Sequence, residues 1–154
     1  MTDLSQVTYC GLYCGLCVTR NRMPRQAGEL RETMRKEGWE SWGQQVPGFN
    51  EFWSFLNGIA DGEENCSCRG GTCGPSFCSI RTCAPEKGVE VCPFCDEYPC
   101  YRIEGLAKGY VNLIADGYRM RLIGPDAWIA EQEQRRRTGF AYTDIRNHPY
   151  SIPE

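Results

Sequence analysis

Cysteines are the residues of this chain whose type and spacing could do chemistry. Eleven of the 154 residues are cysteine. They form an N-terminal trio, a middle group of five and a second trio: Cys10, Cys14 and Cys17; Cys66, Cys68, Cys73, Cys78 and Cys83; Cys92, Cys95 and Cys100. A content this high is explained by disulfides, by buried inert thiols or by metal ligation.

A disulfide framework does not suit this sequence. Disulfides persist in oxidising compartments, but the segment from Met1 to Cys10 has neither the basic start nor the apolar run of a signal peptide. No stretch reaches the ~20 apolar residues of a membrane span, and an odd number of cysteines cannot all pair. The sequence therefore predicts a cytoplasmic protein without membrane contact, whose reduced thiols bind metal.

Two C-x₂-C pairs, Cys14–Cys17 and Cys92–Cys95, give this prediction its geometry. Two intervening residues let the chain turn so that both thiolates face one ion. Cys10 and Cys100 each add a third ligand, and a closed tetrahedral zinc site needs a fourth. We expect that fourth ligand to come from the middle group.

Two or more Zn²⁺ ions are therefore expected. One would use the N-terminal trio with a middle cysteine, and the other the second trio with Cys78 or Cys83. Histidine is nearly absent, since only His148 occurs, so the sites are all-cysteine. The predicted ligands are Cys10, Cys14, Cys17, Cys68, Cys73, Cys78, Cys83, Cys92, Cys95 and Cys100. Two closed sites leave three thiols over, and the pairing of cysteines into sites stays open.

An iron–sulfur protein is the first alternative. Cys10, Cys14 and Cys17 have the spacing with which radical S-adenosylmethionine enzymes hold a four-iron cluster. Those enzymes are built on a large partial α/β barrel, and a full barrel of this kind takes ~250 residues. Leu16 also stands where they usually carry an aromatic residue. Both features argue against this class of enzyme. The bacterial ferredoxin run is also absent. Spacing alone does not separate zinc from a redox cluster.

The elements that position the cysteines are predicted to be helices. Apolar residues recur with a 3.6-residue period over Pro24–Lys36, over Phe49–Ala60 and over 103–114. A last helix is expected from Pro125 to Thr138, with acids early and arginines late. We expect a mainly α fold in which four or so helices surround an irregular, metal-pinned segment, with at most short strands.

The middle of the chain, 66–100, is the predicted irregular segment. Glycine and proline interrupt it repeatedly, so it cannot bury enough apolar surface to offset its conformational entropy. No linker or repeat divides the chain. A single domain, 1–154, is expected, with 24–60 and 101–139 mainly helical.

The ordered motifs resemble a known family. They are the run Cys10–Cys17, the pair Cys78 and Cys83, the run Glu86–Cys95, the run Glu97–Cys100 and the end segment Gly139–Arg146. Together they are similar to the prokaryotic family known as domain of unknown function 3795, a candidate zinc-binding family. The resemblance implies a small cytoplasmic protein of bacteria or archaea, common in anaerobes. Cys66 and Cys68 depart from the pair with two intervening residues that we expect there, so which of them is a ligand stays open.

The net charge of the chain argues against one class of function. The formal net charge of −3, made more negative by thiolates, argues against nucleic-acid binding. The sequence predicts a metal-binding protein that acts through an unknown protein or small-molecule partner. A zinc enzyme with an open thiolate site is the second alternative, and whether the chain is an enzyme stays open.

Metal removal should unfold at least the middle segment. Structural zinc contributes roughly 10–16 kcal/mol of apparent binding free energy in small peptides. A strong chelator under reducing conditions should therefore abolish the cooperative melt followed by circular dichroism. An unchanged melting curve after verified metal loss would contradict this expectation.

Overall fold

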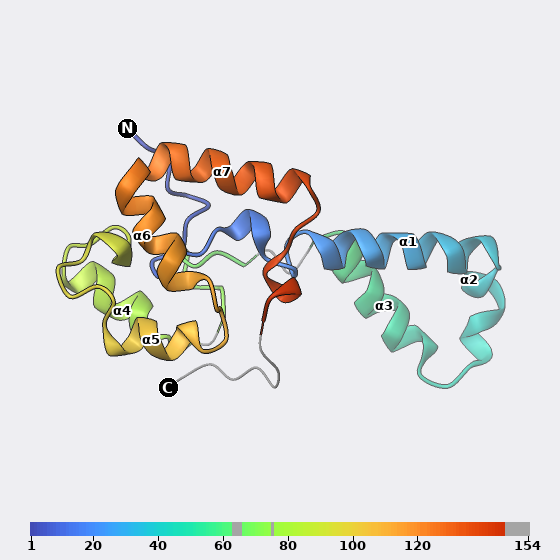
Figure 1. Cartoon of the computed structure of the whole chain (residues 1–154). Coiled ribbons are helices and arrows are strands. Elements are labelled where there is room, and N and C mark those ends of the chain that lie inside the picture. The colour runs from blue at the N-terminus through green and yellow to red at the C-terminus, as the bar shows by residue number, and fades with distance from the viewer. Residues whose placement is uncertain (63–65, 75, 147–154) are drawn as a thin grey trace. The chain divides into compact units, whose positions relative to one another are not determined.

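The computed structural model describes residues 1–62, 66–74 and 76–146 (Figure 1). In these ranges the chain forms seven α-helices, four 3₁₀ turns and two isolated β-bridges. The helices are α1 (Arg22–Lys36), α2 (Trp39–Trp42), α3 (Phe49–Ala60), α4 (Ser79–Glu86), α5 (Tyr101–Ala107), α6 (Leu113–Ile123) and α7 (Pro125–Arg137). The predicted mainly helical fold with at most short strands is confirmed, but the helices outnumber the four or so expected. No helix of the described part is long and apolar enough to cross a membrane.

The chain falls into two compact units. Unit 1 consists of Met1–Cys17 and Cys66–Glu154, and unit 2 of Val18–Asn65. All eleven cysteines therefore belong to unit 1. The metal chemistry predicted from sequence depends on how this unit folds.

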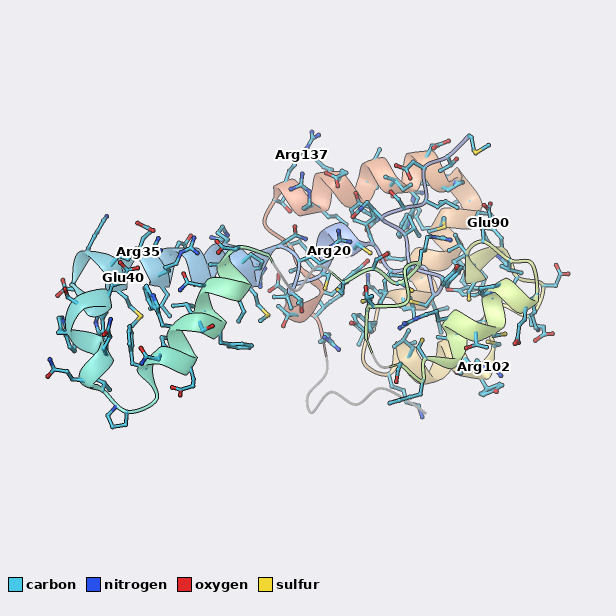
Figure 2. The ribbon with its side chains drawn as sticks, turned by 180° about the vertical axis from the view of Figure 1, so that it is seen from behind. Arg20, Arg35, Glu40, Glu90, Arg102 and Arg137 are labelled. Carbon is cyan, nitrogen blue, oxygen red and sulfur yellow. The ribbon has the colours of Figure 1, made fainter. Side chains whose placement is uncertain are left out.

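Unit 2 is a helical hairpin. Both segments are helical, as their period predicted, and α1 and α3 pack against each other and run in opposite directions (Figure 1). Phe49 stacks between Trp39 and Trp53, with ring centroids 5.7 and 5.5 Å away. Exposed ion pairs add to this packing, among them Arg35 with Glu40 at 2.9 Å (Figure 2).

Helix α4 corrects the prediction of an irregular segment over 66–100. Ile80 and Ala84 lie one turn apart on its buried face. At its end the Val89 N–H donates to the Ala84 carbonyl and the Gly88 N–H to the Pro85 carbonyl, a Schellman motif with glycine at φ +66°. An eight-residue helix with two buried residues and an internal proline gives no readable period, and so it was missed.

The single helix predicted over 103–114 is also wrong. Helix α5 ends at Ala107, a turn follows, and α6 begins at Leu113. Ile103 and Leu113 are nevertheless buried in the same apolar cluster, with Tyr110 of the turn against it. The apolar period continues across the turn between α5 and α6 because buried residues of both helices face the same cluster. The helix predicted from Pro125 is confirmed as α7.

Two apolar clusters form the core of unit 1. The first joins Leu16, Met120 and Trp128, all fully buried, with Val7, Tyr13, Val91 and Tyr142. The second, around Ile103 and Leu113, contains Cys10, Ile80 and Tyr98, and four further cysteines pack against it. Helix α6 contributes to both clusters, so it fixes the cysteine-rich turns relative to α7.

One guanidinium holds the non-helical part of unit 1 together. The Nε–H of Arg69 donates to the carbonyls of Leu4 and Val7, at 2.9 Å each, and a terminal N–H donates to Glu90 at 2.8 Å. Its Cζ also lies 4.7 Å from the Tyr9 ring centroid. Arg69 thereby ties the turn after Cys68 to the N-terminal segment and to the residues before Cys92.

Gly117 on α6 should not tolerate a side chain. A Cβ there would meet the hydroxyl oxygen of Tyr98 and lie 2.6 Å from its Cζ. We expect Gly117→Ala to lower the free energy of urea unfolding by about 1–3 kcal/mol through overpacking. Gly28→Ala is the matched control, because a Cβ at Gly28 of α1 meets nothing within 4 Å, and it should raise stability by about 0.5–1 kcal/mol. Two effects of the same sign would contradict the contact.

Arg69→Lys should be costly although it keeps the charge. A single ammonium cannot reproduce the fork that reaches three carbonyls, so we expect the free energy of unfolding to fall by about 2–4 kcal/mol. The control is Arg119→Lys, whose ion pair with Glu131 lies at the surface, with both side chains more than two-fifths exposed. That change should cost less than about 1 kcal/mol. Equal costs in the two variants would show that Arg69 is no anchor.

Candidate metal centre

Four cysteines of unit 1 line one small cavity of about 20 Å³. Cys83 lies on α4, Cys92 and Cys95 bound the 3₁₀ turn Cys92–Phe94, and Cys100 is the N-cap of α5. The other wall residues are Ala84, Lys87, Val89, Glu97, Tyr98, Arg102 and Ile103. The second trio is thus brought together with Cys83, one of the two middle cysteines predicted for it.

Local backbone bonds set the directions of these cysteines. The Cys95 N–H donates to the Cys92 carbonyl at 2.8 Å, so the C-x₂-C segment closes into one tight turn. The Cys92 N–H donates to the Tyr9 carbonyl at 2.7 Å. Gly11, at φ +94°, passes so close to Pro93 that a Cβ would lie 3.0 Å from the proline ring. The turn of the second trio is therefore fixed against the chain around Cys10.

Charged groups surround the cavity. Burial first, and then the neighbouring thiols, raise the pKa of Cys92 to about 12. Lys87 and Glu97 form an ion pair of 2.5 Å. Arg121 donates 2.7 Å to the Cys95 carbonyl and also bonds the Pro93 carbonyl. Burial and the neighbouring thiols thus favour the neutral form of Cys92, with Lys87 and Arg121 close by.

Arg102 is the cavity residue that sequence reasoning missed. It stands on α5 (Figure 2) with its guanidinium 4.6 Å from the Tyr101 ring centroid. Its Nε is buried and finds no hydrogen-bond acceptor among the described residues. Cysteine spacing could not reveal this buried donor in the cavity wall, because its position depends on the packing of α5.

Cys10 lies in the core beside these thiols. Its Sγ is 3.0 Å from the Thr8 hydroxyl oxygen. Burial raises the pKa of Cys10 to about 12, and the thiols of Cys68 and Cys78 add to the shift. Cys10 and Cys78 both belong to the apolar cluster that contains Cys92. The N-terminal trio thus reaches the middle group through its first member.

The other two members of the N-terminal trio flank the 3₁₀ turn Cys14–Leu16. Cys14 is buried and Cys17 half-buried. Cys17 is one of the thiols that raise the pKa of Cys73. Across 1–62, 66–74 and 76–146, no three cysteine, histidine, aspartate or glutamate side chains are already arranged to hold an ion. Both sites predicted from sequence therefore stay predictions, and His148 lies outside the described residues.

Cys66 is a further residue that the predicted ligand set omitted. Its thiol is hydrogen-bonded to that of Cys73, and Cys68 is a near neighbour of the same group. The available sequence signal was the close C-x-C spacing of Cys66 and Cys68. That spacing does not reveal that Cys73 folds back onto Cys66.

Comparison with protein families identifies the relationship of this chain. The family described as protein of unknown function (DUF3795) matches residues 6–105, a range that contains every cysteine of the chain. No curated protein and no solved structure matches. Because the match covers more than half of the chain and all of its cysteine motifs, the chain belongs to the DUF3795 family.

Proposed function

We propose that this protein binds zinc through cysteine thiolates, with one ion held by Cys83, Cys92, Cys95 and Cys100. The carrying observation is the shared cavity, which gathers four thiols from three elements separated by up to 17 positions. We further propose that the protein works in the cytoplasm through a protein or small-molecule partner.

The size of the cavity supports a single ion. A cavity needs at least about 10–15 Å³ to accept one water-sized particle, and this one measures about 20 Å³. Convergence of the four sulfurs on one Zn²⁺ would fill this space.

The polar groups of the cavity also fit a thiolate-bound ion. Four thiolates around Zn²⁺ carry a net charge of about −2. Lys87 and Arg102 bring positive charge to the cavity wall, and Glu97, which pairs with Lys87 at 2.5 Å, brings one negative charge. A thiolate sulfur would give the buried Arg102 Nε–H the acceptor that it lacks among the described residues. Arg102 would thus offer the thiolates both a positive charge and a hydrogen-bond donor.

A structural role follows from the donor count. Four protein ligands leave a tetrahedral zinc ion no open position for a substrate or water. The bound ion would cross-link α4, the Cys92–Phe94 turn and α5, and its free energy of binding would stabilise the fold. The protein would then act through its surface, which the bound ion stabilises, and not through chemistry at the ion.

Cys83→Ser tests the ligand set against Cys78→Ser. Both cysteines are half-buried and were equal candidates from sequence, but only Cys83 lines the cavity. Cys78 is the N-cap of α4, a position that serine suits. In protein purified without oxygen, elemental analysis should show that Cys83→Ser loses about one equivalent of zinc and that Cys78→Ser loses none.

Zinc loss in Cys78→Ser with full zinc content in Cys83→Ser would contradict the proposal, and so would a parent protein without metal. Iron with matching sulfide in the parent, seen as brown colour and visible absorption, would keep the ligands and replace zinc by a cluster.

A further inference from the structure

A second cavity of unit 1 is large enough for a small organic molecule. It measures about 500 Å³, and ligand pockets usually measure about 300–1,000 Å³. Its walls come from the N-terminal segment, the turn at Arg69, the segment 88–91 after α4, Phe94 and the start of α7. None of the four cysteines of the candidate zinc site lines this cavity. It is therefore a separate candidate binding site, which we call the N-terminal cavity.

Apolar side chains form one part of the wall of the N-terminal cavity. Leu4, Val89 and Pro125 line it, together with Phe94, whose side chain is 48% exposed. Leu4 packs against the apolar cluster that contains the buried Val91. This part of the wall is thus an extension of the core. A ligand with an apolar group would remove its surface from water, which is favourable.

The guanidinium of Arg69 brings a positive charge to the N-terminal cavity. Its Nε–H and one Nη2 N–H donate to three carbonyls, and the Tyr9 ring covers it with the centroid 4.7 Å from Cζ. These contacts fix the group and leave Nη1 without an acceptor among the described residues. No carboxylate of the same part of the chain pairs with it. A fixed guanidinium with N–H groups to spare suits a carboxylate ligand.

Glu90 brings a negative charge to the same cavity. It lies in the segment after α4 (Figure 2), and its carbonyl oxygen accepts the Nη2 N–H of Arg69 at 2.8 Å. Its side chain is exposed and forms no ion pair within the described ranges. Asp126, next to Pro125, adds another carboxylate, which accepts the Thr2 hydroxyl at 2.9 Å. These acids disfavour a ligand with several negative charges and favour one that also carries a positive charge.

We propose that the N-terminal cavity binds a free α-amino acid with an apolar side chain. The carboxylate of the ligand accepts from Nη1 of Arg69, its ammonium group donates to the Glu90 carboxylate, and its side chain packs on Leu4, Val89 and Phe94. An α-amino acid carries both charges on one carbon, and the two protein groups come from residues that are hydrogen-bonded to each other. The proposal goes beyond zinc binding, because no proposed zinc ligand lines this cavity.

Three forms of phenylalanine test the two charges separately. L-Phenylalanine has both, N-acetyl-L-phenylalanine lacks the ammonium group and L-phenylalanine amide lacks the carboxylate. Each is titrated into the ¹⁵N-labelled protein, and binding is followed by NMR chemical shifts. For L-phenylalanine we expect a Kd of about 1 mM or tighter, as its number of atoms allows. Both blocked forms should bind at least about tenfold more weakly, because each loses a hydrogen bond to a charged group.

Glu90→Gln tests the same contact from the protein side. This variant should weaken L-phenylalanine binding at least about tenfold and should not weaken binding of the N-acetyl form. The matched control is Glu86→Gln, which removes an exposed carboxylate at the end of α4 that does not line the cavity. It should bind L-phenylalanine like the parent. Arg69 is tested through the amide ligand, because its replacement would also loosen the fold.

Each alternative outcome contradicts the proposal. Equal affinity for the N-acetyl form would identify a site for a peptide carboxyl terminus, and equal affinity for the amide would show that Arg69 binds no carboxylate. No saturable shifts with L-phenylalanine up to about 10 mM, a Kd too weak for a built site, would overturn the cavity as a ligand site. So would equal binding by the Glu90→Gln variant. Zinc content measured in the same samples separates these failures from a failure of the zinc site.

Discussion

Donation from arginine side chains to main-chain carbonyls is the interaction on which the rest of unit 1 depends. Arg69, Arg81 and Arg121 each bond two or more carbonyls in segments that belong to no α-helix. Such segments have carbonyl groups that no helix or sheet satisfies, and leaving them unpaired in a core costs free energy. A guanidinium carries five N–H donors in a rigid planar group, so one arginine side chain can hydrogen-bond to several loop segments at once. The positions of the cysteine turns follow from these anchors.

The same arginines bring charge to where thiols are crowded. Without an ion, burial and mutual repulsion raise the pKa of Cys10, Cys73 and Cys92 to about 12, so these groups stay protonated at neutral pH. A bound divalent cation would reverse that preference, because it attracts the thiolate more strongly than the neighbouring thiols repel it. Folding of unit 1 and thiolate chemistry would then be coupled: the turns bring the thiols together, and the ion would supply the free energy that glycine-rich and proline-rich turns lack.

Unit 2 is held by different physics. It contains no cysteine, and its core is the stack of Trp39, Phe49 and Trp53 with Leu56 and Ala27 buried between α1 and α3. Burial of aromatic and aliphatic surface supplies its stability, supported by Arg31, which bonds Asp61 at 2.7 Å and Asn57 at 3.3 Å. Apolar burial thus stabilises both units, and only unit 1 adds cysteine-rich turns held by arginine.

The sequence by itself determined the helical class and the three longest helices, and it singled out the cysteines as candidate ligands. Periodicity and cysteine spacing report local geometry, and local geometry is what a helix or a C-x₂-C turn requires. The apolar period predicted one helix over 103–114 because residues of both α5 and α6 face the same apolar cluster. It did not predict α4, because only two residues of that helix are buried and two positions do not define a period. Tertiary structure alone decided that Cys83 rather than Cys78 joins the second trio at the cavity, that Cys73 folds back toward Cys66, and that Arg102 lines the same cavity. These neighbourhoods arise from contacts between segments far apart in the chain, and spacing along the sequence carries no information about which segments will meet.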